Sequence, residues 1–572
     1  MKSFGTLYGR LGVLQARSSL VRLLVLVVCL SIILVPNLCL YMTGAPGDRD
    51  GLSWRPLLAA LGFVLILLSL LKRVPRSVSV VVAFCVLPVS SVAWYVTSFG
   101  APVDINVLSL IAETGSSEAR DVAFSMPAWV WLGFFLSSGM AIAVVLWPWK
   151  TPFEWPARML GLLGGGVVLI QVLAMRGPDE SMLGPAPDDI PSSEARSALL
   201  SSYPIGVPLL LYDYKASRRV VASAMERRRG QAFGASSELS ADGGRKLYVL
   251  VIGETGRGSR WQINGYGRPT TPGLSARADV ISFSRMSTPF VFTRLSVPAM
   301  ITRSGTRDLS VFNEGSLVAA FKEAGFSTAW ISMQAPLGFH ESMVSSYAGE
   351  ADEVHFLNPS DYATRGFPDM SGVDALLDYV KRQPADANLF VVLHTLGSHF
   401  KYTDRYPLSD AYFLPDRPVN DHVSLYEPKD SLYLSNAYDN TIRYTDKVLN
   451  SLFDRVEGLG GESWVYYSSD HGEAIFDGCD GSSGHGQFNA ETQSVAAAFW
   501  ASSAYVDGHA TQIENLRARA AAPLSTVMVF ETLTGLGGLS MPGQRKGYDF
   551  SADELLATPP AHRYADCETS EE

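Results

Sequence analysis

The 572-residue chain lacks the two common nucleotide-binding signatures, although it has a glycine-rich loop at residues 253–258. The loop has the G-x-x-x-x-G spacing of a phosphate-binding loop, but Ser259 and Arg260 follow where Lys and then Ser or Thr are required. The order of its glycines does not form G-x-G-x-x-G either. The loop carries one carboxylate, Glu254. Because both nucleotide-binding signatures are missing, a role other than nucleotide binding is favoured for it.

Cysteine is scarce, and basic charge is not in excess. Of five cysteines, Cys29, Cys39 and Cys85 lie in apolar segments, where cysteine is usually a small apolar filler. Cys479 and Cys567 could pair in an oxidising compartment, but two free thiols fit their spacing equally well. The formal net charge of −10 argues against a general nucleic-acid-binding protein, because such proteins are usually basic. We therefore expect no nucleic-acid partner.

Charge is also nearly absent from five apolar segments in the first third of the chain. They lie at about 23–42, 56–71, 78–98, 127–147 and 158–175. A membrane span needs roughly 20 such residues, and the second and fifth segments are short by that measure. One apolar run near the N-terminus would suggest a signal peptide, but four more favour a five-helix transmembrane domain over residues 1–176. The interiors of these segments hold no ionisable residue, which argues against a transport path.

The flanking charges predict the orientation in the membrane. Residues 1–22 hold four basic residues and no acid, and the turns after the second and fourth segments are basic. The loop 104–121 instead holds four acids and one arginine. By the positive-inside rule the N-terminus is cytoplasmic, and five spans then place the rest of the chain across the membrane. In a Gram-negative cell this predicts a multi-pass inner-membrane protein with a periplasmic domain.

Residues 177–244 are predicted to be a linker and bridging segment. Residues 177–192 are rich in proline and acids, and residues 234–244 form a flexible Gly/Ser-rich joint. Residues 203–229 mix apolar and basic side chains. This segment could lie on the membrane surface or pack as a helical connector on the soluble domain.

An α/β pattern begins at residue 245. Strand-length apolar runs occupy 247–252, 327–332, 388–394, 463–469 and 495–500. Helical patterns occupy 314–325, 371–383, 436–455 and 523–535. The alternation predicts a domain over 245–560 with a mainly parallel sheet covered on both faces, followed by a tail at 561–572.

Metal-binding residue types follow three of the predicted strands. Glu254 and His394 each end one run, and Asp470 and His471 follow another. Ligands gather at the carboxyl ends of parallel strands, and a catalytic zinc takes about three His, Asp or Glu ligands and keeps an open position. Thr293, just before the predicted helix start "LSVPAMIT", is either an N-cap or a metal-activated nucleophile at an anion-favouring helix end.

A set of short motifs runs through residues 253–486. They are G-E-T-x-R (253–257), N-G-Y-x-R-x-T-x-P (264–272), S-V-P (296–298), "AGFSTAWIS" (324–332), "LHTLGSHFKYTDRYP" (393–407), "NAYDNTIRYTD" (436–446), S-D-H-G-E (469–473) and G-H-G (484–486). In combination these motifs resemble those of the phosphoethanolamine transferases of the alkaline phosphatase and sulfatase superfamily, with the lipid A transferases and mobile colistin-resistance enzymes as the nearest group. The five predicted spans match that family's architecture.

The resemblance implies a set of site residues around one Zn²⁺. Glu254, Asp470 and His471 would bind the zinc. Thr293 would also contact the zinc and would be the nucleophile that carries the phosphoethanolamine group.

Further residues would contact the substrate. His399 and His485 would contact the phosphate and assist proton transfer, and Gln334 would be a polar donor to the substrate. The chain departs from the family at Phe400, where Gly is usual, and at Gly338, where some relatives have Lys.

The implied reaction moves phosphoethanolamine from phosphatidylethanolamine to a glycolipid or glycan, such as lipid A or lipopolysaccharide core, in a membrane-embedded monomer. Pro289 and Ala299 stand where lipid A transferases have cysteines, so the acceptor need not be lipid A. A phosphodiesterase or a phosphoglycerol transferase remains an alternative. A sulfatase is disfavoured, because Met300 stands where its motif needs Arg.

Overall fold

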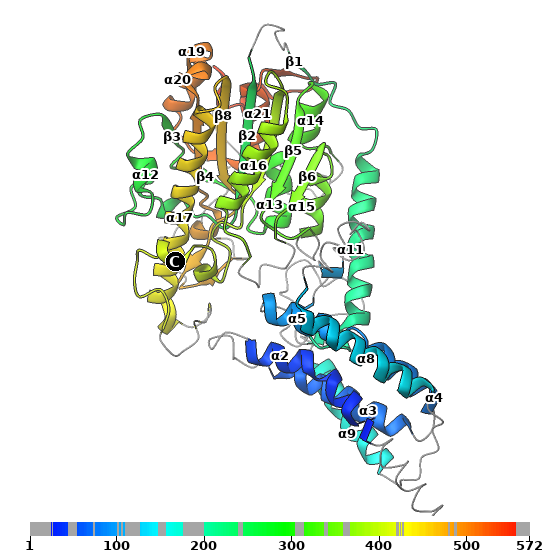
Figure 1. The fold of residues 1–572 in the computed structure, drawn as a ribbon. Coiled ribbons are helices and arrows are strands. Elements are labelled where there is room, and N and C mark those ends of the chain that lie inside the picture. Colours follow the sequence, from blue (N-terminus) through cyan, green and yellow to red (C-terminus); the bar gives the residue numbers. More distant parts are fainter. Residues whose placement is uncertain are drawn as a thin grey trace, which may run out of the picture. The chain divides into compact units, whose positions relative to one another are not determined.

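The structure is a computed structural model that separates into two compact units, Met1–Tyr214 and Lys215–Glu572 (Figure 1). It describes residues 24–43 (residue 26 apart), 54–71, 75–99, 102–103, 107–108, 126–146, 156–174, 199–237, 244–303, 314–336, 341–358, 366–418, 423, 425, 428–478, 481–485 and 489–555. The predicted linker at 177–192, the predicted tail at 561–572, Gly338 and the pair Cys479 and Cys567 lie outside these residues.

The first unit consists of apolar helices. They are α2 (Val35–Thr43), α3 (Arg55–Leu71), α4 (Pro75–Val86), α5 (Val89–Phe99), α8 (Ala128–Leu146) and α9 (Ala157–Ala174). Among the described residues, two helices are long and apolar enough to cross a membrane, Arg76–Thr97 and Ala128–Leu146. Val27–Met42, Arg55–Leu71 and Ala157–Ile170 are apolar but shorter. Apolar helices thus occupy all five predicted places, and two of them reach spanning length.

Small residues let these helices approach closely. A Cβ atom added at Gly164 of α9 would lie 2.5 Å from the carbonyl oxygen of Gly62 in α3. One added at Gly133 of α8 would lie 2.8 Å from the Cβ atom of Ser90 in α5. Close backbone contact at small residues is typical of helices packed in lipid, where the hydrophobic effect does not drive association between helices.

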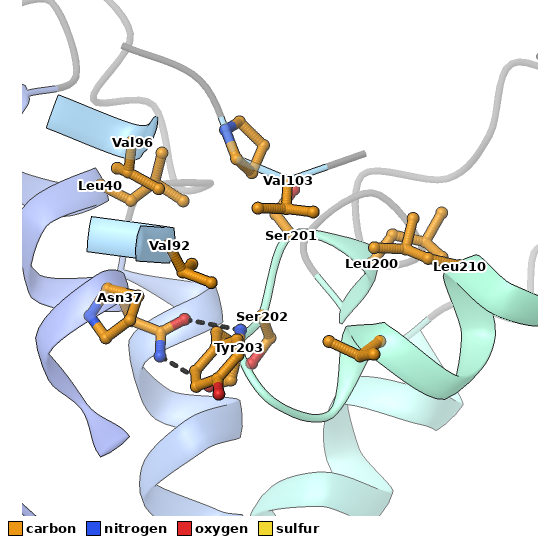
Figure 2. A pocket seen from close by; sticks show the side chains of 13 residues that line it. Asn37, Leu40, Val92, Val96, Val103, Leu200, Ser201, Ser202, Tyr203 and Leu210 are labelled. Carbon is orange, nitrogen blue, oxygen red and sulfur yellow. Dashed lines mark hydrogen bonds between the residues drawn. The ribbon is translucent and has the colours of Figure 1, made fainter. Parts of the chain in front are cut away.

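A buried polar contact fixes residues 199–203 to the helices of this unit. The side-chain amide of Asn37, 1% exposed, donates to the carbonyl of Tyr203 at 2.7 Å and accepts from its N–H at 3.0 Å. Figure 2 shows this pair beside a pocket lined mainly by apolar side chains, among them Leu40, Val92 and Val96. Because a buried amide is costly when unpaired, this reciprocal pair specifies where the segment docks.

The boundary between the two units falls within α11 (Gly206–Arg228). The C-terminal end of α11 belongs to the second unit. There Arg228, whose side chain is 3% exposed, pairs with Glu350 at 2.7 Å and lies over the ring of Tyr347 at 4.0 Å. For the end of the 203–229 segment, these contacts favour the connector over the membrane-surface alternative.

The second unit is built on a seven-stranded sheet with the order β3-β11-β8-β2-β7-β5-β6. The strands are β2 (Lys246–Gly253), β3 (Val280–Ser282), β5 (Ser327–Ser332), β6 (Glu353–Phe356), β7 (Asn388–His394), β8 (Glu462–Ser469) and β11 (Ala497–Ala501). All five predicted runs are strands. The edge strands β3 and β6 were not predicted.

The sheet is mixed rather than wholly parallel. The strands from β8 to β6 pair in parallel, whereas β11 is antiparallel to both β8 and β3. The main helix between β8 and β11 is the four-residue α18 (Ala490–Gln493). Without a long crossover helix the chain turns back along β8, which produces antiparallel pairing.

Helices cover both faces of the sheet (Figure 1). Alternate residues of β2 point to opposite sides, as the period of a strand requires. Tyr248, Leu250 and Ile252 share one apolar cluster with residues of α13 (Thr293–Ile301), α14 (Leu317–Glu323) and α21 (Val529–Leu536). Leu247, Val249 and Val251 share another with α16 (Met370–Arg382) and α17 (Ser431–Glu457). Burial on both faces explains why the central strands are continuous apolar runs.

Candidate metal and nucleophile site

The predicted site residues lie at the carboxyl ends of neighbouring parallel strands. Glu254 follows β2, Asp470 and His471 follow β8 on one side, and His394 ends β7 on the other. Gln334 lies two residues beyond β5, the next strand in the sheet. Residues distant in sequence therefore meet at one edge of the sheet.

Glu254, Asp470 and His471 form a compact cluster of possible metal ligands. Their ligand atoms lie within 4.8 Å of one another, and none of the three residues is more than 1% exposed. The Nε2 atom of His471 is 3.5 Å from Glu254 Oε1 and 3.4 Å from Asp470 Oδ2. Nδ1 of the same ring is 2.9 Å from the carbonyl of Gly472. If Nδ1 donates there, Nε2 keeps a lone pair directed at the carboxylates, as in a metal-binding imidazole.

The electrostatics of this cluster favour a bound cation. Burial raises the pKa of Glu254 to about 8, and the negative charge of Asp470 adds to the effect. Two desolvated carboxylates repel each other, and a divalent ion between them would reverse both effects. Two carboxylates, an imidazole and a hydroxyl are also the oxygen and nitrogen donors that zinc accepts. The residues present therefore fit a zinc ion.

Thr293 adds a hydroxyl to the cluster. It is the first residue of α13, and Phe292 rather than Thr293 occupies the N-cap position. Its Oγ1 lies 3.0 and 3.2 Å from the two carboxylate oxygens of Glu254 and 3.4 Å from Nε2 of His471. Thr293 is therefore not the N-cap of α13. The half-buried hydroxyl lies at the helix end where free N–H groups favour anions.

The loop that carries Glu254 is held in a strained conformation. Thr255 has a φ of +58°, in the left-handed region that non-glycine residues rarely adopt. In this conformation its N–H donates to Asp470 Oδ1 at 2.9 Å and its hydroxyl donates to Glu254 Oε1 at 2.8 Å. A Cβ atom at Gly397 would lie 2.6 Å from the carbonyl oxygen of Glu254, so a neighbouring loop also packs tightly here. Such strain is typical of functional sites.

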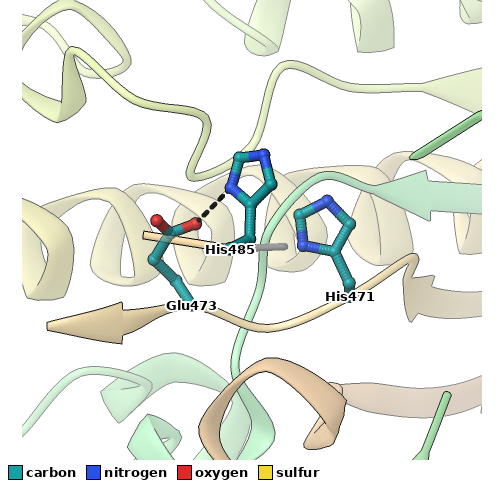
Figure 3. A group of neighbouring side chains, drawn as sticks. All are labelled: His471, Glu473 and His485. Carbon is teal, nitrogen blue, oxygen red and sulfur yellow. Dashed lines mark hydrogen bonds and ion pairs between the residues drawn. The ribbon is translucent and has the colours of Figure 1, made fainter. Parts of the chain in front are cut away.

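His485 lies beside the cluster and pairs with a buried acid. Figure 3 shows its Nδ1 atom directed at Glu473, at 3.0 Å. The imidazole rings of His485 and His471 are 4.6 Å apart. Burial disfavours the charged form of His485, but the carboxylates of Glu473, Glu254 and Asp470 together outweigh it and raise the pKa to about 9. His471, Glu473 and His485 could also group around an ion, but a protonated His485 would be an acid rather than a ligand.

His399 and Gln334 lie around the same cluster in different roles. The rings of His399 and His485 are 6.4 Å apart. Burial, with Arg405 nearby, lowers the pKa of His399 well below its ordinary value, which favours a neutral imidazole. The amide of Gln334 donates to Glu254 Oε2 at 2.8 Å. The structure thus directs Gln334 at a possible metal ligand, and its predicted contact with substrate stays a prediction.

His394 lies apart from the metal cluster. It is 2% exposed, and its Nδ1 atom is 3.5 Å from the hydroxyl of Ser332. Burial lowers its pKa to about 4, so the ring is neutral at physiological pH. We assign it no part in the cluster, although it ends a strand at the same edge.

Two sequence motifs outside the cluster meet on α17. Asp439, which is fully buried, accepts hydrogen bonds from Arg260 at 2.9 Å, Tyr266 at 3.1 Å and Arg268 at 2.5 Å. The hydroxyl of the preceding residue, Tyr438, donates to the carbonyl of Thr255 at 2.6 Å. The N-G-Y-x-R and "NAYDN" motifs therefore hold the loops around Glu254 in place.

Glu473, Thr255 and Asp369 are functional candidates that the sequence did not identify. Glu473 is fully buried against His485, and Asp369 accepts from the N–H groups of Leu396 and Gly397 at 2.8 and 2.9 Å. Glu473 lies inside the S-D-H-G-E motif and Thr255 inside G-E-T-x-R, so both could have been identified from these motifs.

The chain matches one family profile and is similar to a curated relative and to two solved structures. A profile of the family described as Sulfatase matches residues 246–539, just over half of the chain. The Kdo(2)-lipid A phosphoethanolamine 7''-transferase of Salmonella typhimurium is 30% identical over 239 residues, which are 41% of this chain and 40% of that protein. The match thus spans about two fifths of that relative's length.

Two solved structures share the fold. The C-terminal periplasmic domain of EcEptC from Escherichia coli, in complex with Zn, has a TM-score of 0.50 and 24% identity, covering 57% of this chain and 90% of that chain. The integral membrane protein lipooligosaccharide phosphoethanolamine transferase A from Neisseria meningitidis has a TM-score of 0.50 and 19% identity, covering 92% of this chain and 97% of that chain. At these identities the likeness concerns the fold.

Proposed function

Because this chain belongs to the sulfatase family, we propose that it transfers phosphoethanolamine from phosphatidylethanolamine to an envelope glycolipid, such as lipid A or lipopolysaccharide core. The observation that carries the proposal is the position of Thr293. Its hydroxyl lies within 3.0–3.4 Å of Glu254 and His471, at the end of α13 where a phosphate would be favoured. The named activity of the Salmonella relative supports the choice of transferred group.

We assign the metal site to one Zn²⁺ held by Glu254, Asp470, His471 and Thr293. The cluster offers two carboxylate groups, an imidazole nitrogen and a hydroxyl, and the EcEptC domain, which shares the fold, is a complex with Zn. When bound, zinc would lower the pKa of the threonine hydroxyl and neutralise negative charge on the phosphoryl oxygens.

The first step would be a displacement by Thr293. Its Oγ1 atom attacks the phosphorus of the donor, and the bond from phosphorus to the diacylglycerol oxygen breaks. The hydroxyl proton passes to solvent or a nearby base, and His485 donates a proton to the departing diacylglycerol. The ion pair with Glu473 holds His485 in the orientation and the protonated form that this role needs.

The second step would return the threonine. An acceptor oxygen attacks the phosphorus, the bond from phosphorus to Oγ1 breaks, and Thr293 recovers its proton. His399, which burial keeps neutral, can take the proton of the acceptor hydroxyl. The product is the acceptor carrying phosphoethanolamine. The enzyme is regenerated when Thr293 takes back from solvent or the base the proton that it lost in the first step, and when His399 releases its proton through solvent to His485.

A membrane location would suit both substrates. In this proposal residues 1–176 anchor a monomer in the inner membrane, residues 177–244 connect, and residues 245–560 form the periplasmic catalytic domain. The apolar helices of the first unit support the anchor. Anchoring would raise the effective concentration of a lipid donor and a glycolipid acceptor at the site.

The experiment that tests the function follows both products. Purified full-length protein is mixed with radiolabelled phosphatidylethanolamine, with and without lipid A. A transferase labels lipid A and releases diacylglycerol faster when lipid A is present. Release of free phosphoethanolamine at the same rate with and without lipid A would instead identify a phosphodiesterase.

A further inference from the structure

Large apolar side chains are exposed at one edge of the second unit. Within the described part of residues 244–555, six large apolar residues are exposed, and all but Val354 lie on connections that leave the carboxyl ends of β6 and β7. We call these five the apolar rim: Phe367 (58% exposed), Leu408 (67%), Tyr412 (55%), Leu414 (66%) and Leu432 (58%).

Hydrogen bonds from α17 hold the rim near the site. The side-chain oxygen of Asn440 accepts from the N–H groups of Tyr412 and Phe413 at 2.9 and 2.8 Å, and Asn436 donates to the carbonyl of Pro415 at 2.9 Å. Asn436 and Asn440 lie within a turn of Tyr438, which bonds the loop of Glu254. Tyr412 and Leu414 thus lie near the sheet edge of the catalytic cluster, and the backbone around them is fixed while their side chains stay exposed.

The exposed charges on the loop of Tyr412 and Leu414 and on the first half of α17 are basic, and Arg417 and Lys447 among them pair with less exposed acids. Among the described residues of 401–418 and 428–447, the exposed charged side chains are Arg417, Lys429 and Lys447. The acids of the same ranges are buried or half-buried, for example Asp410, which pairs with Lys447 at 2.7 Å. Exposed apolar side chains with basic neighbours are the combination that binds the interface of an anionic bilayer.

We propose that the apolar rim inserts into the interfacial layer of the membrane and presents the catalytic edge to lipid head groups. The occupant is a lipid surface rather than a protein, because the chain also carries apolar helices of spanning length and the exposed charge beside the rim is basic. The link between this contact and donor capture rests on the proposed function. The contact itself does not, because it can be measured without turnover.

The first test measures lipid contact directly. Full-length Leu414→Cys protein, with its five native cysteines replaced by Ser, is labelled with a fluorescent probe in nanodiscs of phosphatidylethanolamine and phosphatidylglycerol. Val354→Cys is the matched control, since Val354 is exposed on a strand of the same unit. Doxyl lipids labelled near the head group should quench the probe at Leu414→Cys several-fold more than at the control. Equal quenching, or a probe shielded from both lipid and aqueous iodide, would overturn the proposal.

The second test measures donor capture. The combined change Leu408→Ser and Leu414→Ser should raise the apparent KM for long-chain donor in nanodiscs roughly three- to tenfold, because less apolar surface meets the bilayer. The kcat value and turnover of water-soluble dihexanoyl donor should stay unchanged, as should those of the control Val354→Ser. An equal loss with both donors, or no loss, would contradict the role in capture. If wild-type protein transfers nothing while the quenching contrast persists, the proposed function fails and the lipid contact stands.

Discussion

Replacing Asp439 tests whether the α17 network stabilises the catalytic unit. Asp439→Ala removes a fully buried carboxylate that accepts from Arg260, Tyr266 and Arg268. Breaking a buried ion pair costs about 3–5 kcal/mol, because the remaining charge is left unpaired. The side chain of Arg260 is 5% exposed and keeps Asp477 at 2.7 Å, and Arg268 is 33% exposed and can reach water. We therefore expect the free energy of unfolding to fall by an amount near the lower end of this range, about 3 kcal/mol.

The assay is thermal unfolding in detergent at one fixed scan rate. A loss of about 3 kcal/mol corresponds to a fall of roughly 4–5 °C in the unfolding midpoint of a domain of about 315 residues, because the entropy of unfolding is about 2.1 cal/mol/K per residue. Asp439→Asn, which keeps the shape of the side chain and one acceptor oxygen, should lower the free energy of unfolding by less than Asp439→Ala does. The matched control is Asp410→Ala, which breaks the pair between half-buried Asp410 and exposed Lys447 and should cost at most about 1 kcal/mol. If Asp439→Ala unfolds within 1–2 °C of the control, the network contributes little and this reasoning is wrong.

Three further outcomes are expected. Thr293→Ala should form no phosphoethanolamine adduct in mass spectra after incubation with donor alone, whereas Thr293→Ser should form some; an adduct on the Ala variant would exclude this nucleophile. Glu254→Gln should lower bound zinc, measured by elemental analysis of purified protein, without lowering expression; an unchanged zinc content would move the metal elsewhere. Burial raises the pKa of Asp549 to about 6, so its contribution favours folding at pH 4 and is lost as the pH rises to 6. Asp549→Asn keeps the acceptor for Ser551 and should gain about 1–3 kcal/mol at pH 7.5 but not at pH 4, as read from urea midpoints.

The central strands could be predicted because burial on both faces leaves a continuous apolar run. β5 and β7 begin and end at the predicted residues. β3 and β6 could not be found this way, since they are edge strands of three and four residues with partly exposed side chains. The antiparallel direction of β11 was also not predicted, because an apolar run indicates a buried strand but not whether it runs parallel or antiparallel to its neighbour.

The cluster itself was predictable because a parallel sheet brings its carboxyl ends together. Glu254, Asp470 and His471 needed only that rule to be placed near one another. The partners of these residues depend on loop conformations that no periodicity encodes. Glu473 reaches His485 because the chain turns between them, and Gln334 points at Glu254 instead of into open space.

The separation of the site residues along the chain sets an order in biosynthesis. Thr255 and Asp470 are hydrogen-bonded partners across 215 positions, and the strand that brings them together is β8. While a ribosome is still synthesising the chain before β8, Glu254 has neither Asp470 nor His471 beside it. A nascent chain therefore lacks two of the three proposed metal ligands, and the Thr293 hydroxyl meets His471 only after β8 has been synthesised.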